Sequence, residues 1–228
     1  MTPPVVVAID GPSGAGKSTV AKMLAARLNV PYIDTGAMYR AIGLAAREAG
    51  IRLPIEDPEA VERIARSLSI RFETAGDQIR VLVDGRDVTG PIREPEISLY
   101  ASAVSAIPGV RRRMVAEQRR LAAEHGGVME GRDIGTKVFP DTPHKFFLTA
   151  SPEVRARRRA AELAARGTPQ PFAEVLAEME TRDRADRTRP DSPLMHDETY
   201  VVLDSSERDP QAVVEEIERA IRAPADGR

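Results

Sequence analysis

Residues 5–19 read Val5-Val-Val-Ala-Ile-Asp-Gly-Pro-Ser-Gly-Ala-Gly-Lys-Ser-Thr19, and this stretch decides the fold class. Its first five residues form an uninterrupted run rich in β-branched side chains, which is typical of a strand buried on both faces in a parallel sheet. Apolar residues then recur at helical spacing, at Val20, Met23, Leu24 and Leu28. The glycine-rich segment therefore lies between a buried strand and the N-terminus of a helix.

The glycine-rich segment matches the pattern G-x-x-x-x-G-K-[ST] of a P-loop. Its glycines let successive backbone N–H groups converge on an anion at a helix N-terminus, where the helix dipole also favours negative charge. We expect Lys17, with a solvent-accessible ammonium, to reach the β- and γ-phosphates, and Ser18 to bind a Mg²⁺ that arrives with the nucleotide. The predicted ATP-binding residues are Gly11, Pro12, Ser13, Gly14, Ala15, Gly16, Lys17, Ser18 and Thr19.

The rest of the chain continues the alternation of buried strands and helices. Further core strands are predicted at residues 31–34, 127–130, 145–149 and 200–203. Residues 69–73 and 78–83 instead alternate apolar and polar side chains, which indicates a half-exposed antiparallel sheet. We therefore predict an α/β fold with a five-stranded parallel sheet flanked by helices, and a substrate-side insert at residues 60–98.

Composition excludes several classes of site. The chain has no cysteine, so disulfides, thiolate metal sites and thiol nucleophiles are impossible, and its three histidines lie far apart. The net charge of -2, from 33 basic and 35 acidic residues, gives no sign of a nucleic-acid or membrane partner. The apolar run at residues 5–9 is too short to span a bilayer. We expect a cytoplasmic protein.

P-loops serve GTPases, motor ATPases and small-molecule kinases, so the loop alone leaves the acceptor open. A GTPase normally recognises guanine with an Asn-Lys-x-Asp element. The only asparagine of this chain is Asn29, which is followed by Val30, so the GTPase class is excluded. A motor ATPase is less readily excluded, although an inserted β region suits closure over a second small substrate. In a non-enzyme alternative, the arginine-rich segments 111–120 and 155–159 bind RNA and the loop acts as a nucleotide switch.

Four ordered motifs resemble those of bacterial cytidylate kinases. They are Asp10-Gly-Pro-Ser-Gly-Ala-Gly-Lys-Ser-Thr19, Asp34-Thr-Gly-Ala-Met-Tyr-Arg40, Gly131-Arg-Asp-Ile-Gly-Thr-Lys-Val-Phe-Pro140 and Arg182-Asp-Arg-Ala-Asp-Arg-Thr-Arg189. The resemblance implies transfer of the ATP γ-phosphate to CMP or dCMP. We expect a monomer that binds no nucleic acid and no membrane. It also implies a P-loop core at residues 1–59 and 99–228, a monophosphate-binding insert at 60–98, and a helical lid at approximately 155–190. Kinases for UMP, AMP or another metabolite remain the alternative.

The same resemblance assigns the acceptor site. It places cytosine near Ser102, Arg111 and Asp133, where the carboxylate would accept from the exocyclic amine and the guanidinium would donate to ring acceptors. Because uracil inverts part of that pattern, we expect discrimination against UMP. The acceptor phosphate is expected near Arg40 and Arg132, in a pocket lined by Thr35 and Tyr39.

Charged side chains of the predicted lid complete the assignment. Arg182, Asp186 and Arg189 are four and three residues apart, which places them on one face of a helix. The resemblance assigns Arg182 and Asp186 to the ribose and Arg189 to the phosphate region, and a surface Arg–Asp pair is the alternative. Four arginines open the lid helix: Arg155, Arg157, Arg158 and Arg159.

Phosphoryl transfer depends mainly on alignment and charge stabilisation, because a nucleotide phosphate is already a nucleophile. The predicted catalytic residues are Lys17, Arg132, Arg157 and Arg158. We expect at least two of the four lid arginines to lie on a solvated helix face. For Glu130, two roles stay open: a hydrogen bond to a magnesium-bound water at the end of its strand, or a helix-capping or core-edge role.

Overall fold

The computed structural model describes residues 4–75 and 78–223. The chain forms two compact units, and each is described by itself. Met1–Tyr32 and Leu121–Arg228 make up the first, here called the sheet unit, and Ile33–Arg120 make up the second, the hairpin unit. The insert predicted at residues 60–98 lies within the hairpin unit, and its boundaries stay a prediction.

A five-stranded sheet has the strand order β2-β6-β1-β7-β8. The strands are β1 (Val6–Asp10), β2 (Tyr32–Asp34), β6 (Gly127–Gly131), β7 (His144–Thr149) and β8 (Val201–Asp204). Strand β1 pairs in parallel with β6 and β7, and β7 with β8. Residues 7–9 of the central β1 have no exposed surface, as their uninterrupted apolar run predicts. The predicted α/β fold is confirmed.

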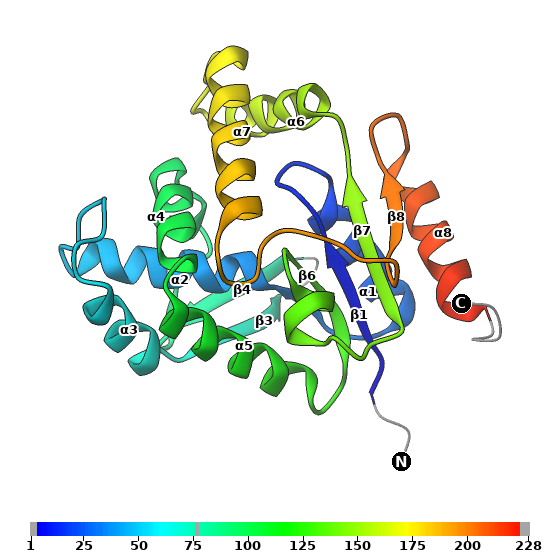
Figure 1. Cartoon of the computed structure of the whole chain (residues 1–228), viewed down its shortest axis with the longest axis horizontal. Helices are drawn as coiled ribbons and strands as arrows, with labels where there is room; N and C mark the ends of the chain where they lie inside the picture. The colour runs from blue at the N-terminus through cyan, green and yellow to red at the C-terminus, as the bar shows by residue number, and fades with distance from the viewer. Residues whose placement is uncertain (1–3, 76–77, 224–228) are drawn as a thin grey trace. The chain divides into compact units, whose positions relative to one another are not determined.

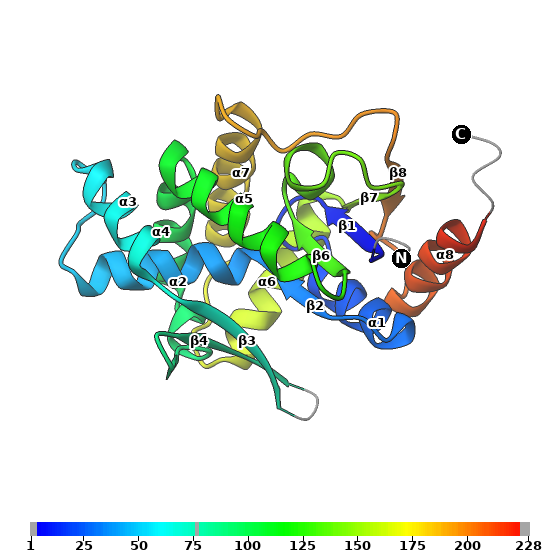
Figure 2. The same ribbon diagram turned by 90° about the horizontal axis from the view of Figure 1, so that it is seen from below.

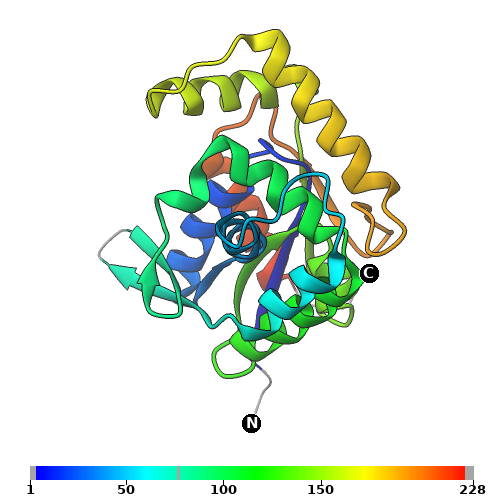
Figure 3. The ribbon, with the colours of Figure 1, turned by 90° about the vertical axis from the view of Figure 1, so that its left-hand side faces the viewer.

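Helices of the sheet unit form two groups. Helices α1 (Lys17–Leu28) and α8 (Pro210–Arg222) pack together against the sheet, as Figure 2 shows. Helices α6 (Pro152–Ala165) and α7 (Phe172–Thr188) form a pair beyond the carboxyl ends of β1 and β7 (Figures 1 and 3). Ala156, Leu163, Val175 and Met179 form the small apolar core that holds this pair together. Within the described ranges, no helix has the length and apolarity needed to cross a membrane.

Local sequence determines where helix α6 begins and ends. The Ser151 hydroxyl accepts from the N–H of Val154, and Pro152 occupies the first turn of α6, where its missing N–H costs nothing. Gly167 follows α6 with a φ of 77°, a left-handed conformation that suits glycine. Both the start and the stop of this helix agree with the sequence signals.

The hairpin unit combines four helices with a second sheet. The helices are α2 (Thr35–Glu48), α3 (Pro58–Ser67), α4 (Pro95–Ser105) and α5 (Pro108–Ala122). The strands β3 (Ile70–Ala75), β4 (Gln78–Val83) and β5 (Arg86–Asp87) pair antiparallel, as the alternating pattern predicts (Figure 2). A short 3-10 helix, η1 (Pro91–Arg93), follows them. Helix α2 packs against α4 so closely that a Cβ on Gly43 would lie 2.9 Å from the Tyr100 Cβ.

Candidate active site

The loop between β1 and α1 requires glycine at several positions. Gly11, Gly14 and Gly16 have φ values of 148°, 76° and 87°, a backbone region that other residues rarely adopt. At Gly11 a Cβ would also lie 2.0 Å from the Leu148 carbonyl oxygen. Within the described part of the chain, no side chain caps the N-terminus of α1. Its N–H groups therefore remain directed at the loop, the arrangement that binds phosphate.

Lys17 is buried rather than solvent-accessible, so that expectation is wrong. Its side chain folds back under the loop, where Nζ donates to the Pro12 carbonyl oxygen at 2.7 Å and the residue is 6% exposed. Burial, and then the charge of Arg132, lower the pKa of Lys17 to about 7; Arg182 acts in the same direction, against Glu130. Three cationic side chains thus gather beside the loop. This cluster favours a ligand with several negative charges.

Ser18 is the residue near the loop that was predicted to meet a nucleotide-bound Mg²⁺. Among the described residues, no group of three or more His, Asp or Glu side chains could hold a metal by itself. Ser18 is exposed in the first turn of α1, as a hydroxyl that meets a nucleotide-bound Mg²⁺ must be. The buried Glu130 accepts from the Tyr32 hydroxyl at 2.5 Å, a contact between neighbouring strands that fits the core-edge role.

Arg158 of α6 lies beside the P-loop. Its guanidinium donates to the Ser205 hydroxyl at 3.1 Å and to the Ser205 carbonyl at 2.6 Å, and that hydroxyl donates to the Ala15 carbonyl of the loop. A Cβ on Gly16 would lie 3.8 Å from Arg158 Nη1. Arg157 is exposed on the same helix. Of the two lid arginines predicted to be catalytic, Arg158 is therefore the one held at the loop.

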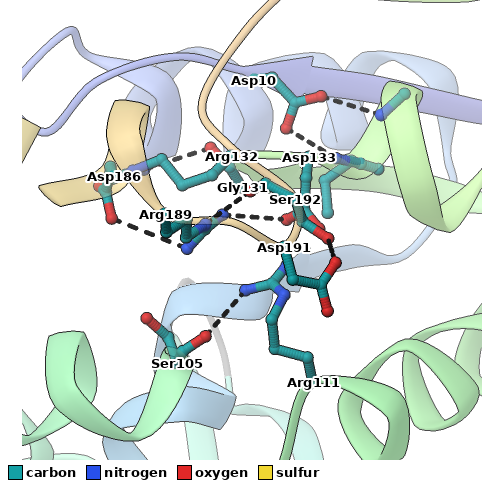
Figure 4. A network of polar contacts seen from close by, with 12 residues as sticks. Asp10, Ser105, Arg111, Gly131, Arg132, Asp133, Asp186, Arg189, Asp191 and Ser192 are labelled. Atoms are coloured by element: carbon teal, nitrogen blue, oxygen red, sulfur yellow. Dashed lines mark hydrogen bonds and ion pairs between the residues drawn. The ribbon is translucent and has the colours of Figure 1, made fainter. Parts of the chain in front are cut away.

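A buried ionic network joins the end of β6 to the end of α7 (Figure 4). Arg132 Nε donates to Asp186 Oδ2 at 2.9 Å, and Arg189 lies 3.8 Å from the Asp186 carboxylate and 3.9 Å from that of Asp133. Burial alone would raise the pKa of Asp186, but Arg132 lowers it below its ordinary value, so the carboxylate is ionised at neutral pH. Four residues predicted to bind the acceptor thus lie together.

Arg189 reaches this network from outside the helix. Helix α7 ends at Thr188, and the extended Arg189 donates from Nε to the Ser192 carbonyl oxygen at 2.5 Å. The prediction that Arg182, Asp186 and Arg189 share a helix face is therefore correct only for the first two. The chain turns back after α7, where the Leu194 N–H donates to the Asp186 carbonyl.

Asp10 fixes the turn that presents Asp133. This turn is η2 (Ile134–Val138), a π-helical segment, and its first two N–H groups both donate to the Asp10 carboxylate at 2.9 Å. The Tyr200 hydroxyl donates to the same carboxylate at 2.8 Å. Burial raises the pKa of Asp10 to about 6, whereas these hydrogen bonds act in the opposite direction. Sequence reasoning assigned no role to Asp10 or Tyr200.

In the hairpin unit, two arginines act on Asp34, the residue that caps the N-terminus of α2. Asp34 caps this helix by accepting from the Ala37 N–H, and Arg93 donates to its other oxygen at 3.0 Å. Burial would raise the pKa of Asp34, but Arg93 and then Arg40 lower it below its ordinary value. Arg40 and Thr35 belong to one of the four motifs and were predicted to bind the acceptor phosphate, whereas Arg93 belongs to none of them.

The predicted base-reading residues of the hairpin unit also lie together. Arg111 is 2% exposed, donates from Nη1 to the Ser105 carbonyl at 3.2 Å (Figure 4), and lies 5.7 Å above the ring of Tyr39. The Ser105 hydroxyl donates to the carbonyl of Ser102 at 2.8 Å. These contacts hold a guanidinium and an aromatic ring in fixed positions beside α4.

With this geometry in place, comparison with known proteins is informative. The model of the family described as cytidylate kinase matches residues 7–223. The chain belongs to the cytidylate kinase family. It is 47% identical over 218 residues to the cytidylate kinase of Geobacter sp. (strain M21), which covers 96% of this chain and 93% of that protein. It is 49% identical over 223 residues to that of Caldanaerobacter subterraneus subsp. tengcongensis, covering 98% and 97%.

A comparison of structures supports the fold alone. An uncharacterized protein from Eubacterium ventriosum ATCC 27560 matches with a TM-score of 0.53 and 15% identity, covering 96% of this chain and 99% of that one. The cytidylate kinase family match, in contrast, runs through both units and includes every predicted site residue from Gly11 to Arg189. The resemblance seen in four motifs is therefore a relationship of the whole chain.

Proposed function

We propose that this kinase transfers the γ-phosphate of ATP to CMP or dCMP, giving ADP and CDP or dCDP. Membership of the cytidylate kinase family and relatives 47–49% identical over nearly the full length support this activity. One observation at the site supports this activity most directly. Arg132 lies close enough to Lys17 to lower its pKa, and the same guanidinium bonds to Asp186. The donor loop thus adjoins side chains assigned to the acceptor.

In the proposed reaction, the P-loop backbone and Lys17 hold the donor phosphates. A Mg²⁺ ion bound with ATP would neutralise phosphate charge, and Ser18 is the residue that would contact it. Lys17, Arg132 and Arg158 are positioned around the loop to stabilise negative charge as the phosphoryl group moves. We propose that Arg157 joins them when the α6–α7 lid closes over the reactants and excludes water.

Membership of the cytidylate kinase family supports a set of acceptor-binding residues. We propose that Asp133, Arg111 and Ser102 read cytosine, while Asp186 and Arg182 bind the ribose. The proposed phosphate-binding residues are Thr35, Tyr39, Arg40, Arg132 and Arg189. To these we add Arg93, because its guanidinium and the charge of Arg40 both act on Asp34 at the start of α2.

Assays of the purified protein with ATP, Mg²⁺ and CMP, dCMP, UMP or AMP test this function. A base that leaves one buried polar group unpaired costs about 1 to 3 kcal/mol, so we expect kcat/KM for UMP to be at least about fivefold lower than for CMP. Equal turnover of all four acceptors would contradict the proposal. Asp133→Ala should lose the preference for CMP and keep ATP binding, whereas the exposed Asp141→Ala serves as the matched control.

We further propose that the protein acts as a monomer in the cytoplasm, where its nucleotide substrates are found, without a nucleic-acid partner. One chain supplies both the donor and the acceptor residues, so the reaction needs no second copy. Size-exclusion chromatography with light scattering would measure the mass directly. A stable dimer that loses activity on dissociation would contradict the monomer.

A further inference from the structure

Arg155 joins three parts of the sheet unit. This side chain, in the first turn of α6, is only 4% exposed. Nη1 donates to the Ser13 carbonyl oxygen of the P-loop and Nε to the Ala150 carbonyl oxygen after β7, both at 3.0 Å. Nη1 also lies 2.7 Å from Asp183 Oδ2 on α7. One rigid guanidinium therefore connects the donor loop, the sheet and the second lid helix.

Asp183 extends this connection along α7. Burial would lower the pKa of Arg132, but the negative charges of Asp186 and then Asp183 raise it. The charge of Asp183 therefore acts on the arginine that lies beside Lys17. The other oxygen of Asp183 is buried, and no group among the described residues donates a hydrogen bond to it. The ion pair with Arg155 thus supplies the closest compensation of the Asp183 charge. The resulting run of alternating charges is Arg155, Asp183, Arg132, Asp186, Arg189 and Asp133.

Apolar packing reinforces the same junction. A Cβ on Gly14 would lie 3.0 Å from the Cβ and the carbonyl oxygen of Arg155, and 2.9 Å from the Met179 terminal methyl. The turn of the P-loop thus lies directly against both lid helices. There is no room for even one more carbon atom between the loop and these helices, so a shift of the loop toward them must move α6 and α7.

We propose that Arg155 and Asp183 are positioning residues that couple the two substrates: a triphosphate in the P-loop fixes α7 through them and thereby tightens binding of the monophosphate. This inference rests on the proposed function. The loop bonds to the guanidinium through Ser13, and α7 bonds to the same guanidinium through Asp183. Ordering of the loop around phosphates therefore orders the helix that carries Arg182 and Asp186, so the second ligand loses less freedom on binding.

The coupling is measured as the ratio of CMP dissociation constants without and with saturating adenylyl imidodiphosphate and Mg²⁺, by calorimetry. Coupled sites typically show a ratio of about 5 to 150, so we expect at least about fivefold for the wild type. Arg155→Met and Asp183→Asn should each bring the ratio close to one, and the double variant should lower it no further. Arg155→Lys, with one ammonium for three acceptors, should also lose most of the coupling.

Arg166→Met is the matched control, because Arg166 directly follows the same helix and forms an exposed pair with Glu162. It should retain the wild-type ratio. Thermal unfolding identifies variants that fold, and if Arg155→Met does not, Asp183→Asn and Arg155→Lys decide. An unchanged ratio in folded Asp183→Asn, or a wild-type ratio near one, would overturn the inference. CMP turnover by the wild type is measured first, since its absence would contradict the proposed function instead.

Discussion

The pKa of Lys17, about 7, makes ATP binding depend on pH. Burial lowers this value from the ordinary 10.5, so at pH 8 most free protein carries a neutral amine. Bound phosphates favour the charged form and restore it. We therefore predict that ATP binding takes up about one proton at pH 8 and almost none at pH 6. Calorimetry in buffers of different ionisation enthalpy measures this uptake.

Lys17→Met provides the control, since a side chain without a titrating group cannot take up the proton. Absence of uptake at pH 8 in the wild type would contradict the low pKa. The same shift affects stability with a definite sign. Between about pH 7 and pH 10 the unfolded state binds more protons at Lys17 than the folded state, so this residue's contribution to the free energy of unfolding rises with pH.

The Asp10 carboxylate should be more important for stability than the tyrosine that donates to it. Asp10→Asn replaces one acceptor oxygen with an NH₂ group that faces a backbone N–H of η2, and an unsatisfied buried donor costs about 1 to 3 kcal/mol. Tyr200→Phe removes one hydrogen bond, worth about 0.5 to 1.5 kcal/mol. Urea denaturation compares the two variants. A larger loss for Tyr200→Phe would contradict the assigned role of Asp10.

At the scale of residues, the motifs identify the side chains that we propose to act on ligands, but they miss residues that position them. Asp133 and Asp186 lie in motifs with a clear resemblance, and the structure brings both to Arg189. The Asp10–Tyr200 hydrogen bond spans 190 positions, so no local pattern encodes it. The burial of Lys17 was likewise missed, because it follows from the folded path of the loop.

At the scale of elements, we predict that the P-loop depends on its contact with the lid helices. Gly14→Ala places a methyl group against Arg155 and Met179 in a left-handed backbone, whereas Gly167→Ala meets the same backbone strain with no atom within 4 Å. Strain alone costs about 1 to 2 kcal/mol. Gly14→Ala should therefore be the more destabilised variant in thermal unfolding and the only one with weaker ATP binding. Equal effects of the two substitutions would contradict a packed junction.

Elements with strong periodicity were predictable, and irregular ones were not. All five core strands and the β3–β4 pair follow from apolar runs and alternation. The π-helical segment η2 has no sequence period of its own and exists because Asp10 binds its first two N–H groups. Spacing alone placed Arg189 on a helix, yet α7 ends one residue earlier. The chain turns there, and the Leu194 N–H then donates to the Asp186 carbonyl oxygen.

At the scale of the whole molecule, several arginines of the arginine-rich segments are buried or paired with acidic residues. In residues 111–120, Arg111 is buried, and Arg113 and Arg120 both pair with Glu117. In residues 155–159, Arg155 is buried in its pair with Asp183. Much of the cationic charge that suggested an RNA-binding alternative is therefore neutralised by ion pairs with neighbouring acidic side chains. This agrees with the net charge of -2.

This charge distribution predicts weak, non-specific RNA binding. Non-specific binding comes almost entirely from unpaired cations that release counterions, and its dissociation constant is typically about 10⁻⁴ to 10⁻⁶ M at physiological salt. We expect fluorescence anisotropy with a single-stranded RNA to give a value at or above the weak end of that range, unchanged by ATP. Arg112→Ala, at an exposed arginine of α5, should have no further effect. Tight binding that falls steeply with salt and responds to ATP, in a protein without CMP turnover, would instead support the nucleotide-switch alternative, because only a surface of free cations can produce that salt dependence.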